Sequence, residues 1–317
     1  MTLLTAAADA LTDDFPHRTF ALRHTLASNK LLTLPRIIEA VRELPRDRLE
    51  FNSGKAAINQ DPNATPLIDL DPVEIVRQIE TCGAWMVLKQ IEDIPAYRAL
   101  VEDVLLTVAR ARGHDGLEAA GFSDIEGFIF VSSPHSTTPF HADSDENFFF
   151  QVHGEKLFYV YDNADRWIAS DEALEGVVAR HRNLPYEAKF DARQTAYRLF
   201  PGDGIFVPYQ WPHYVKTADG YSISLSVTWK SAAVRRQNDL HVVNSMLRGL
   251  GLPQAAPGAN AALDMVKLAL FRTATSAVEP LRKSETMRRL LRSIAFGKNA
   301  NYYYRAGAND DGTKKAA

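Results

Sequence analysis

The sequence has little of several features that would assign a protein to a class at once. It holds one cysteine, Cys82, among 317 residues, so no disulfide can form within the chain and a reducing compartment is expected. The formal net charge of −3 argues against nucleic acid as a partner. No stretch approaches the ~18 apolar residues that a membrane-spanning helix needs.

Marks of secretion and of several common enzyme classes are also missing. The opening stretch MTLLTAAADALTDDF has no basic start, and Asp9, Asp13 and Asp14 interrupt and close its apolar part. A signal peptide needs a positive beginning and an unbroken apolar core. No Ser-His-Asp arrangement, P-loop or Rossmann glycine pattern is present. We therefore expect a cytoplasmic protein without a membrane segment.

The sequence pattern changes twice along the chain, from helical to strand-like and back to helical. Residues 1–123 look mainly helical, with one helix starting at Asp71-Pro72 and another predicted from Pro95 to about Arg112. Residues 124–231 hold short β-branched and aromatic stretches between turn residues, which is typical of an antiparallel sandwich or barrel. Helical periodicity returns over 232–306, and the polar tail 307–317 is expected to be disordered.

These regions predict an α+β protein with a mainly β core. The N-terminal region would pack on the barrel as a helical buttress, and the C-terminal region would extend from it. No low-complexity linker demands a separate second domain.

Two histidines and an aspartate predict a metal site. His141 and Asp143, in TPFHADSDENFFFQVHGEK, are two residues apart and so share a side of an extended strand. His213 follows a Trp-Pro corner in PGDGIFVPYQWPHYVKT. Two imidazoles and one carboxylate leave adjacent positions open on an octahedral metal, as in non-haem Fe(II) oxygenases. A lone His-x-Asp is more often a hydrogen-bonded surface pair, but the conjunction favours the metal.

Lys156 predicts an anionic ligand. A two-residue turn at 154–155 would fold a hairpin that places Lys156 opposite His153, on the same face as Phe149 and Asn147. An unpaired buried ammonium is very unfavourable, so a lysine inside an aromatic-lined barrel needs an anion such as a metal-bound dicarboxylate. The alternative is a solvated lysine beside its turn.

Together these residues resemble the cupin-like JmjC family of Fe(II)- and 2-oxoglutarate-dependent oxygenases, and most nearly the factor-inhibiting-HIF type of hydroxylase. The resemblance covers roughly residues 128–229. The motifs that carry it are TPFHAD, NFFFQVHGEK, PGDGIFVP, WPH and SISLSVTW.

The resemblance implies a double-stranded β-helix, the cupin or jelly-roll barrel. It implies that His141, Asp143 and His213 bind Fe(II) and that Lys156 pairs with the distal carboxylate of 2-oxoglutarate. Further residues are implied near this co-substrate: Thr138 as a hydroxyl donor, Asn147 near its metal-bound end, and Thr228, which stands where the family often has Asn. The family's early-strand tyrosine has no obvious equivalent, although Phe128 or Phe130 could occupy its region.

The implied reaction consumes O₂ and hydroxylates a protein side chain, or a small molecule or sugar. The alternatives are a cupin dioxygenase or isomerase that does not use 2-oxoglutarate, and a non-enzymatic cupin-fold binding or regulatory protein. We expect the substrate to enter near Asp145, Glu146 and Trp211. The C-terminal stretches 262–271 and 287–296 could join two copies as a homodimer, or pack back on the barrel.

Overall fold

The computed structural model describes residues 3–6, 10–180 and 183–278, together with residues 286, 287, 290 and 293. The predicted tail 307–317 and nearly all of the predicted helical region beyond residue 278 lie outside the described residues. The chain divides into two compact units, which are residues 1–170 with 183–235, and residues 171–182 with 236–317. The predicted N-terminal region shares the first unit with the predicted barrel, except that residues 171–182 of the barrel region belong to the second unit.

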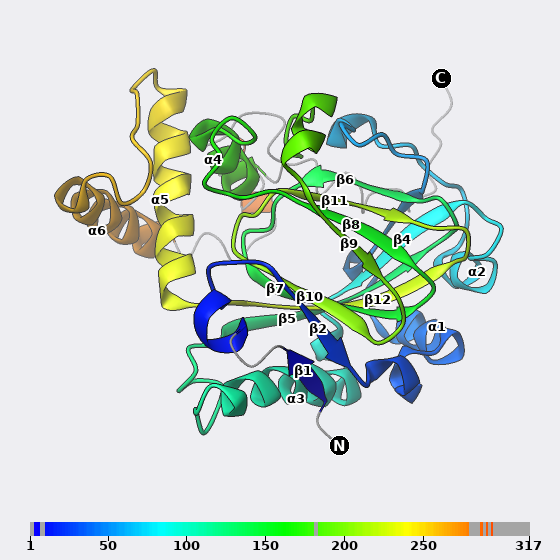
Figure 1. Ribbon diagram of the computed structural model, residues 1–317. Helices are drawn as coiled ribbons and strands as arrows, with labels where there is room; N and C mark the ends of the chain where they lie inside the picture. The colour runs from blue at the N-terminus through cyan, green and yellow to red at the C-terminus, as the bar shows by residue number, and fades with distance from the viewer. Residues whose placement is uncertain are drawn as a thin grey trace, which may run out of the picture. The chain divides into compact units, whose positions relative to one another are not determined.

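Two antiparallel sheets make up the first unit (Figure 1). The larger sheet has eight strands, in the order β1 (Leu4–Ala6), β2 (Phe20–His24), β10 (Asp203–Val207), β7 (Glu146–His153), β12 (Ser222–Lys230), β5 (Ser123–Ser132), β4 (Ala84–Lys89) and β3 (Leu49–Ser53). The smaller sheet has four strands, in the order β6 (Thr137–His141), β11 (His213–Thr217), β8 (Lys156–Val160) and β9 (Thr195–Leu199).

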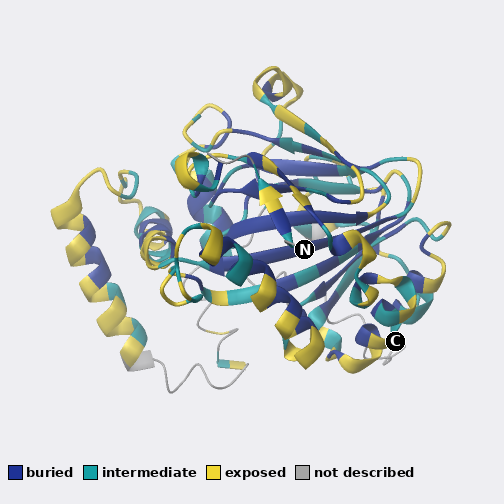
Figure 2. Cartoon of the chain, turned by 60° about the horizontal axis from the view of Figure 1, so that its bottom comes forward, coloured by how far each residue is buried: buried dark blue, intermediate teal, exposed yellow. Residues whose placement is uncertain are grey.

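The strands from β5 to β12 form a double-stranded β-helix. Four of them, β5, β12, β7 and β10, lie side by side in the larger sheet, and the other four make the smaller one. Between the sheets lies an apolar cluster with members on both, including Phe149 and Ile205 from one sheet and Phe158 and Val215 from the other. The central strands are correspondingly buried (Figure 2). The predicted barrel is therefore confirmed.

The N-terminal region contributes strands as well as helices. Its helices are α1 (Leu34–Glu43), α2 (Pro72–Arg77) and α3 (Pro95–Ala111). Asp71 caps α2 by accepting a 2.8 Å hydrogen bond from the N–H of Val73, as its position predicts. β1 to β4 extend the larger sheet on both sides of the barrel strands. The expectation of a mainly helical buttress was therefore incomplete.

The predicted hairpin between β7 and β8 is wrong in its register. These strands belong to different sheets and do not pair; β7 lies between β10 and β12, and β8 lies between β11 and β9. The turn at Gly154 instead carries the chain from one sheet to the other. The predicted inward side of Lys156 is nevertheless right, because the interior faces of the two sheets oppose one another.

The second unit is helical within the described residues. It contains α4 (Asp171–Arg180), α5 (Ala232–Gly249) from Arg236 onward, and α6 (Ala261–Val278). Arg248 binds the buried carboxylate of Glu175 through two hydrogen bonds of 2.9 Å. Leu263, Val266 and Leu270 leave an apolar stripe of α6 exposed. The predicted homodimer stays a prediction, and its second stretch, 287–296, lies almost wholly outside the described residues.

In the part of the chain that the structure describes, no helix combines the length and the apolar character needed to span a membrane.

Candidate metal centre

The three predicted ligands converge at one end of the barrel strands. His141 ends β6 and His213 begins β11, and the two residues are direct cross-strand partners. Asp143 lies in the loop between β6 and β7, so the prediction that it shares one extended strand with His141 is wrong. One potential ligand atom from each residue lies within 4.8 Å of the others. The Nε2 atoms of both histidines are 3.8 Å from the Asp143 carboxylate, His141 from Oδ1 and His213 from Oδ2.

Backbone carbonyls hold both imidazoles in the tautomer that a metal needs. Nδ1 of His141 lies 2.7 Å from the carbonyl oxygen of Pro139, and Nδ1 of His213 lies 2.9 Å from that of Trp211. A carbonyl only accepts, so each Nδ1 carries the proton and each Nε2 is left with a free lone pair. Burial, reinforced by the neighbouring His141, lowers the pKa of His213 to about 4. The neutral ring required of a metal ligand is therefore favoured.

A cavity of about 110 Å³ brings the metal residues and the predicted co-substrate residues together. Its walls are formed by Phe128, Phe130, Thr138, His141, Asp143, Asp145, Asn147, Phe149, Lys156, Phe158, His213, Val215, Ser226 and Thr228. All seven residues predicted for iron and 2-oxoglutarate line this one space. They come from β6, β7, β8, β11 and β12 and from the loop before β7, so only the folded barrel assembles them.

Lys156 is the buried cation of this cavity. Only 2% of the residue is exposed, and its Nζ lies 5.5 Å and 5.4 Å from the ring centroids of Phe130 and Phe149. Burial lowers the pKa of Lys156 to about 7. Among the described residues it has no ion-pair partner, so an anionic ligand would supply the missing countercharge.

Thr138 has a partner that the sequence did not reveal. The indole N–H of Trp85, on β4, donates to Oγ1 of Thr138 at 3.1 Å. A hydroxyl carries one proton, and here its oxygen already accepts from Trp85. The Thr138 proton is therefore available to an acceptor in the cavity. Neither Phe128 nor Phe130 can act as a hydrogen-bond donor in place of the family's tyrosine, although both line the cavity.

Asn147 is directed toward one of the predicted metal ligands. Its Nδ2 lies 3.3 Å from Oδ2 of Asp143, and its Oδ1 accepts a 2.6 Å hydrogen bond from Ser226. Thr228 lines the same wall, and its hydroxyl lies 3.5 Å from the carbonyl oxygen of Glu126. Both residues thus occupy the predicted region.

Of the three predicted substrate residues, only Asp145 lines the cavity. It forms a 2.5 Å ion pair with Lys230, although burial raises the pKa of Asp145 to about 6. A residue beside the substrate entrance should be accessible to solvent, but Glu146 is only 4% exposed. It points to the opposite face of β7 from Asn147, as successive strand residues do. Trp211 is half-buried against the apolar cluster and does not line the cavity.

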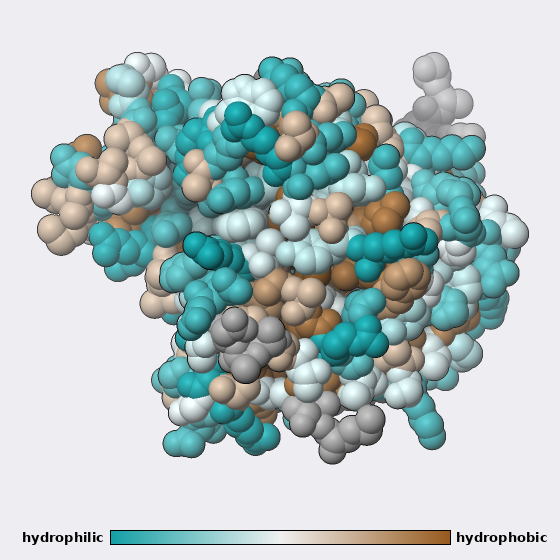
Figure 3. Space-filling view, in the orientation of Figure 1, coloured by the Kyte–Doolittle hydropathy of each residue, from teal (hydrophilic) through white to brown (hydrophobic). Residues whose placement is uncertain are grey.

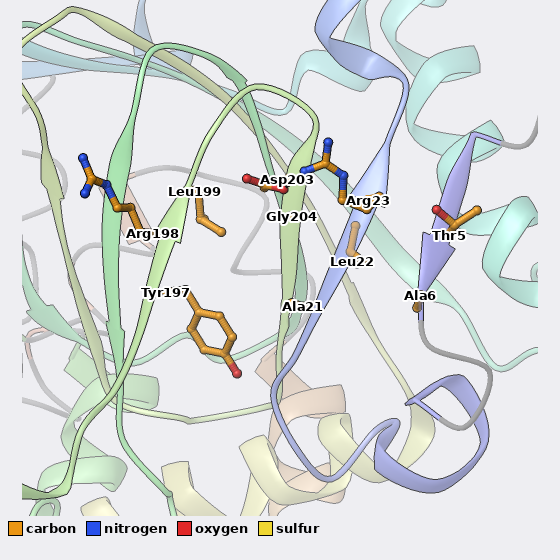
Figure 4. Close-up of a pocket in the computed structure, with 10 residues that line it drawn as sticks. All are labelled: Thr5, Ala6, Ala21, Leu22, Arg23, Tyr197, Arg198, Leu199, Asp203 and Gly204. Atoms are coloured by element: carbon orange, nitrogen blue, oxygen red, sulfur yellow. Dashed lines mark hydrogen bonds and ion pairs between the residues drawn. The ribbon is translucent and has the colours of Figure 1, made fainter.

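A larger hollow of about 360 Å³ lies elsewhere in the first unit, among β1, β2, β9 and β10 (Figure 4). Its two arginines are already paired, Arg23 with Asp203 and Arg198 with Glu155. Hydrophilic and apolar residues are interspersed over this face of the molecule (Figure 3). The hollow contains none of the three predicted metal ligands.

Comparison with known proteins gives a family match for the barrel region. Residues 96–233 match the model of the cupin-like domain. The match confirms the cupin resemblance predicted from the motifs, and it includes every residue of the metal cluster and of the cavity wall.

Two curated proteins share part of this sequence. The HSPB1-associated protein 1 homolog of Danio rerio is 28% identical over 138 residues, which are 40% of this chain and 29% of that protein. Lysine-specific demethylase 8 of Xenopus tropicalis is 30% identical over 101 residues, which are 30% of this chain and 23% of that protein. The matches thus span less than a third of either relative.

Among solved structures, one of Escherichia coli ycfD aligns with 91% of this chain and 72% of its own, at 13% identity and a TM-score of 0.48. A second structure, of Escherichia coli ribosomal oxygenase YcfD, aligns with 90% of this chain and 70% of its own, at 16% identity and a TM-score of 0.45.

Proposed function

We propose that this protein is an Fe(II)- and 2-oxoglutarate-dependent oxygenase that hydroxylates a protein side chain, or a small molecule or sugar. One observation carries the proposal: a single cavity of about 110 Å³ contains both a two-histidine, one-carboxylate cluster and a buried lysine that has no countercharge among the described residues. A metal cluster alone would suit many cupins. The added cation favours a co-substrate with a free carboxylate.

The residues that line the cavity fit both Fe(II) and 2-oxoglutarate. His141, Asp143 and His213 offer the donor set that non-haem iron oxygenases use, and they leave positions open for co-substrate and O₂. Lys156 would pair with the far carboxylate of 2-oxoglutarate, and Thr138 would donate its hydroxyl proton to the same group. When bound, Fe(II) with 2-oxoglutarate would supply the oxidising chemistry, which leaves succinate and CO₂ as by-products.

The cavity wall would exclude water from the reaction. Phe128, Phe130, Phe149 and Phe158 line the space beside the polar groups. Apolar rings leave few hydrogen-bonding sites for water, and electrostatic interactions strengthen where water is excluded. A cavity this small would be largely filled by 2-oxoglutarate, so we place the substrate beside it, on the side of Asp145, which lines the cavity and pairs with Lys230.

The comparisons support the proposal at a coarser level. The matched family model supports the cupin-like scaffold, and a lysine-specific demethylase is among the relatives that share part of it. Those relatives are much longer than the matched segments, so their substrates do not transfer. The choice between a protein and a small-molecule substrate rests on experiment.

The test has two parts. The full chain, stripped of metal and reloaded with Mn(II), should bind 2-oxoglutarate in a calorimetric titration. The Fe(II)-loaded protein, incubated with 2-oxoglutarate and cell extract, should form succinate, and mass spectrometry should find a species that gains one oxygen. His213→Ala should abolish metal binding, and with it both succinate formation and the incorporation of oxygen.

His153→Ala is the matched control, because His153 is exposed and stacks on Tyr221 away from the cavity. It should behave as the unaltered protein does. Metal binding without any affinity for 2-oxoglutarate would overturn the co-substrate assignment. Oxygen consumption would then indicate a dioxygenase that binds its substrate directly to the metal, and no turnover at all would indicate a binding protein.

A further inference from the structure

Three buried side chains form a hydrogen-bonded chain that ends on the metal-site carboxylate. Ser226, on β12, donates to Oδ1 of Asn147 at 2.6 Å, and Nδ2 of Asn147 lies 3.3 Å from Oδ2 of Asp143. Ser226 is 2% exposed and Asn147 is 5% exposed. Ser226 and Asp143 lie far apart in the sequence. Only the pairing of β12 with β7 brings them into the same series of hydrogen bonds.

The donors and acceptors of the three side chains permit only one order of donation along this series of hydrogen bonds. An ionised carboxylate only accepts, so the end of the Asn147 amide that faces Asp143 must be the NH₂ group. The amide oxygen then faces Ser226, and the hydroxyl must donate its one proton to it. The carboxylate thus sets which end of the amide faces Asp143. The bond from the Ser226 hydroxyl to the amide oxygen anchors the other end, so the side chain of Asn147 is held at both ends.

Asp143 needs such a restraint because it lies in a loop. Its backbone carbonyl accepts a 3.1 Å bond from the N–H of Gln210, but this bond does not fix the side chain. The two carboxylate oxygens face different histidines, Oδ1 toward His141 and Oδ2 toward His213. A rotation of the carboxylate would change both distances. The bond from Asn147 to Oδ2 opposes that rotation.

We propose that Ser226 is a positioning residue of the metal site, acting through Asn147 to hold the Asp143 carboxylate in its ligating orientation. The inference rests on the proposed function, because it requires that the three-residue cluster binds a metal. Hydrogen bonds to the ligands of a metal typically change its affinity about 10- to 100-fold. Ser226 acts one residue further away, so we expect an effect near the lower end, about 10-fold.

The same strand provides a matched control. Ser224 is also buried on the interior face of β12, and its hydroxyl donates to an amide oxygen, Oε1 of Gln151, at 2.8 Å. Gln151 has no hydrogen bond to a metal ligand; its Nε2 donates to Ser222 and to backbone carbonyls. Ser224→Ala therefore removes a similar buried hydrogen bond without touching the metal site.

The experiment measures the dissociation constant of Mn(II) for the metal-free full chain, by calorimetry and without 2-oxoglutarate. We expect about 10-fold weaker Mn(II) binding for Ser226→Ala and a change of less than about twofold for Ser224→Ala. Ser226→Thr keeps a hydroxyl, so it should bind Mn(II) about as tightly as the unaltered protein. Thermal unfolding of the metal-free variants should show similar losses for the two alanine substitutions. A purely structural role would give equal stability losses and equal metal affinities.

A double substitution isolates the route through Asn147. In an Asn147→Ala background, Ser226→Ala should cause no further loss of Mn(II) affinity, because the intermediate amide is gone. Independent, additive losses would overturn the proposal, and so would a Ser226→Ala protein that binds Mn(II) as tightly as Ser224→Ala. If the unaltered chain failed to bind Mn(II) at all, the proposed function itself would fail, and the inference would fall with it.

Discussion

At the scale of single residues, Lys156 should make co-substrate binding depend on pH. Burial lowers its pKa to about 7, and a bound carboxylate favours the ammonium form and so raises that pKa. Above about pH 7, binding must therefore take up a proton. The affinity for 2-oxoglutarate should weaken as the pH rises from about 7 to 9, by up to about tenfold per pH unit. Calorimetry in buffers of different ionisation enthalpy measures both the affinity and the proton uptake.

Two substitutions at this position separate charge from contact. Lys156→Ala should weaken 2-oxoglutarate binding about 10- to 100-fold at neutral pH while Mn(II) stays bound, because a charge-assisted hydrogen bond contributes about 1.5–3 kcal/mol. Lys156→Arg keeps a cation that does not titrate in this range, so its affinity should be independent of pH. A pH dependence that persisted in the arginine variant would assign the proton to another group.

Trp85 should affect the co-substrate without touching the cavity. Trp85→Phe removes the N–H that occupies the Thr138 oxygen, so the hydroxyl becomes free to rotate away from the carboxylate. A neutral hydrogen bond contributes about 0.5–1.5 kcal/mol, so 2-oxoglutarate binding should weaken about 2- to 12-fold. In a Thr138→Val protein the same substitution should have no further effect. Equal losses in both backgrounds, measured by calorimetry, would mean that Trp85 acts by packing alone.

At the scale of secondary-structure elements, the crossing from β7 to β8 depends on Gly154. Its φ of +70° suits glycine, and a Cβ there would lie 2.1 Å from the carbonyl oxygen of Tyr221. Gly154→Ala should therefore lower the free energy of unfolding by more than about 2 kcal/mol, because both strain and collision act against it. Urea denaturation measures the change.

Gly220 supplies the control for this turn. It lies close to Tyr221 in the sequence, but a Cβ at Gly220 would meet no atom within 4 Å. Gly220→Ala should change the free energy of unfolding by less than about 0.5 kcal/mol. If the two glycine variants were equally stable, the close approach at Gly154 would not govern the crossing.

The strands show what local pattern can and cannot predict. β5 and β7 to β12 were recognisable because β-branched and aromatic stretches alternate with turn residues, whereas the pattern predicted β6 as a continuation of β7. β1 has three residues and β2 five, and such short segments carry too little periodicity to be told from loops or helix ends. The turn at 154–155 is equally compatible with a hairpin and with a crossing between sheets. Which of the two forms depends on pairing with β10, β11 and β12, far along the chain.

The site divides in the same way. His141, Asp143 and Lys156 could be predicted because their residue types stand close together in one stretch. The reasons for their directions were wrong, since Asp143 lies in a loop and Lys156 lies in a different sheet from β7. Trp85 and Ser226 act through contacts with residues 53 and 79 positions away. Tryptophan in an apolar strand and serine in a β-strand are common, so neither carries a local signal. Glu146 was misplaced because a polar stretch does not reveal which of its residues begins the buried strand.

At the scale of the whole molecule, the metal and co-substrate should stabilise one unit only. Every residue of the candidate site lies in the first unit. The four tryptophans, at positions 85, 167, 211 and 229, also lie there. Tryptophan fluorescence therefore reports the first unit alone, whereas far-UV ellipticity also reports the helices of the second. The two signals can thus separate the unfolding of the two units.

We expect two thermal transitions, of which only one responds to ligand. Mn(II) and 2-oxoglutarate at about 100 times their dissociation constants should stabilise the first unit by about 2.7 kcal/mol for each binding equilibrium. The fluorescence midpoint should then rise, while part of the ellipticity change stays at its original temperature. His213→Ala should abolish the shift, because the added ligands no longer bind. If fluorescence and the entire ellipticity change instead moved together as one transition, the two units would unfold cooperatively, and ligand binding in the barrel would stabilise the helices as well.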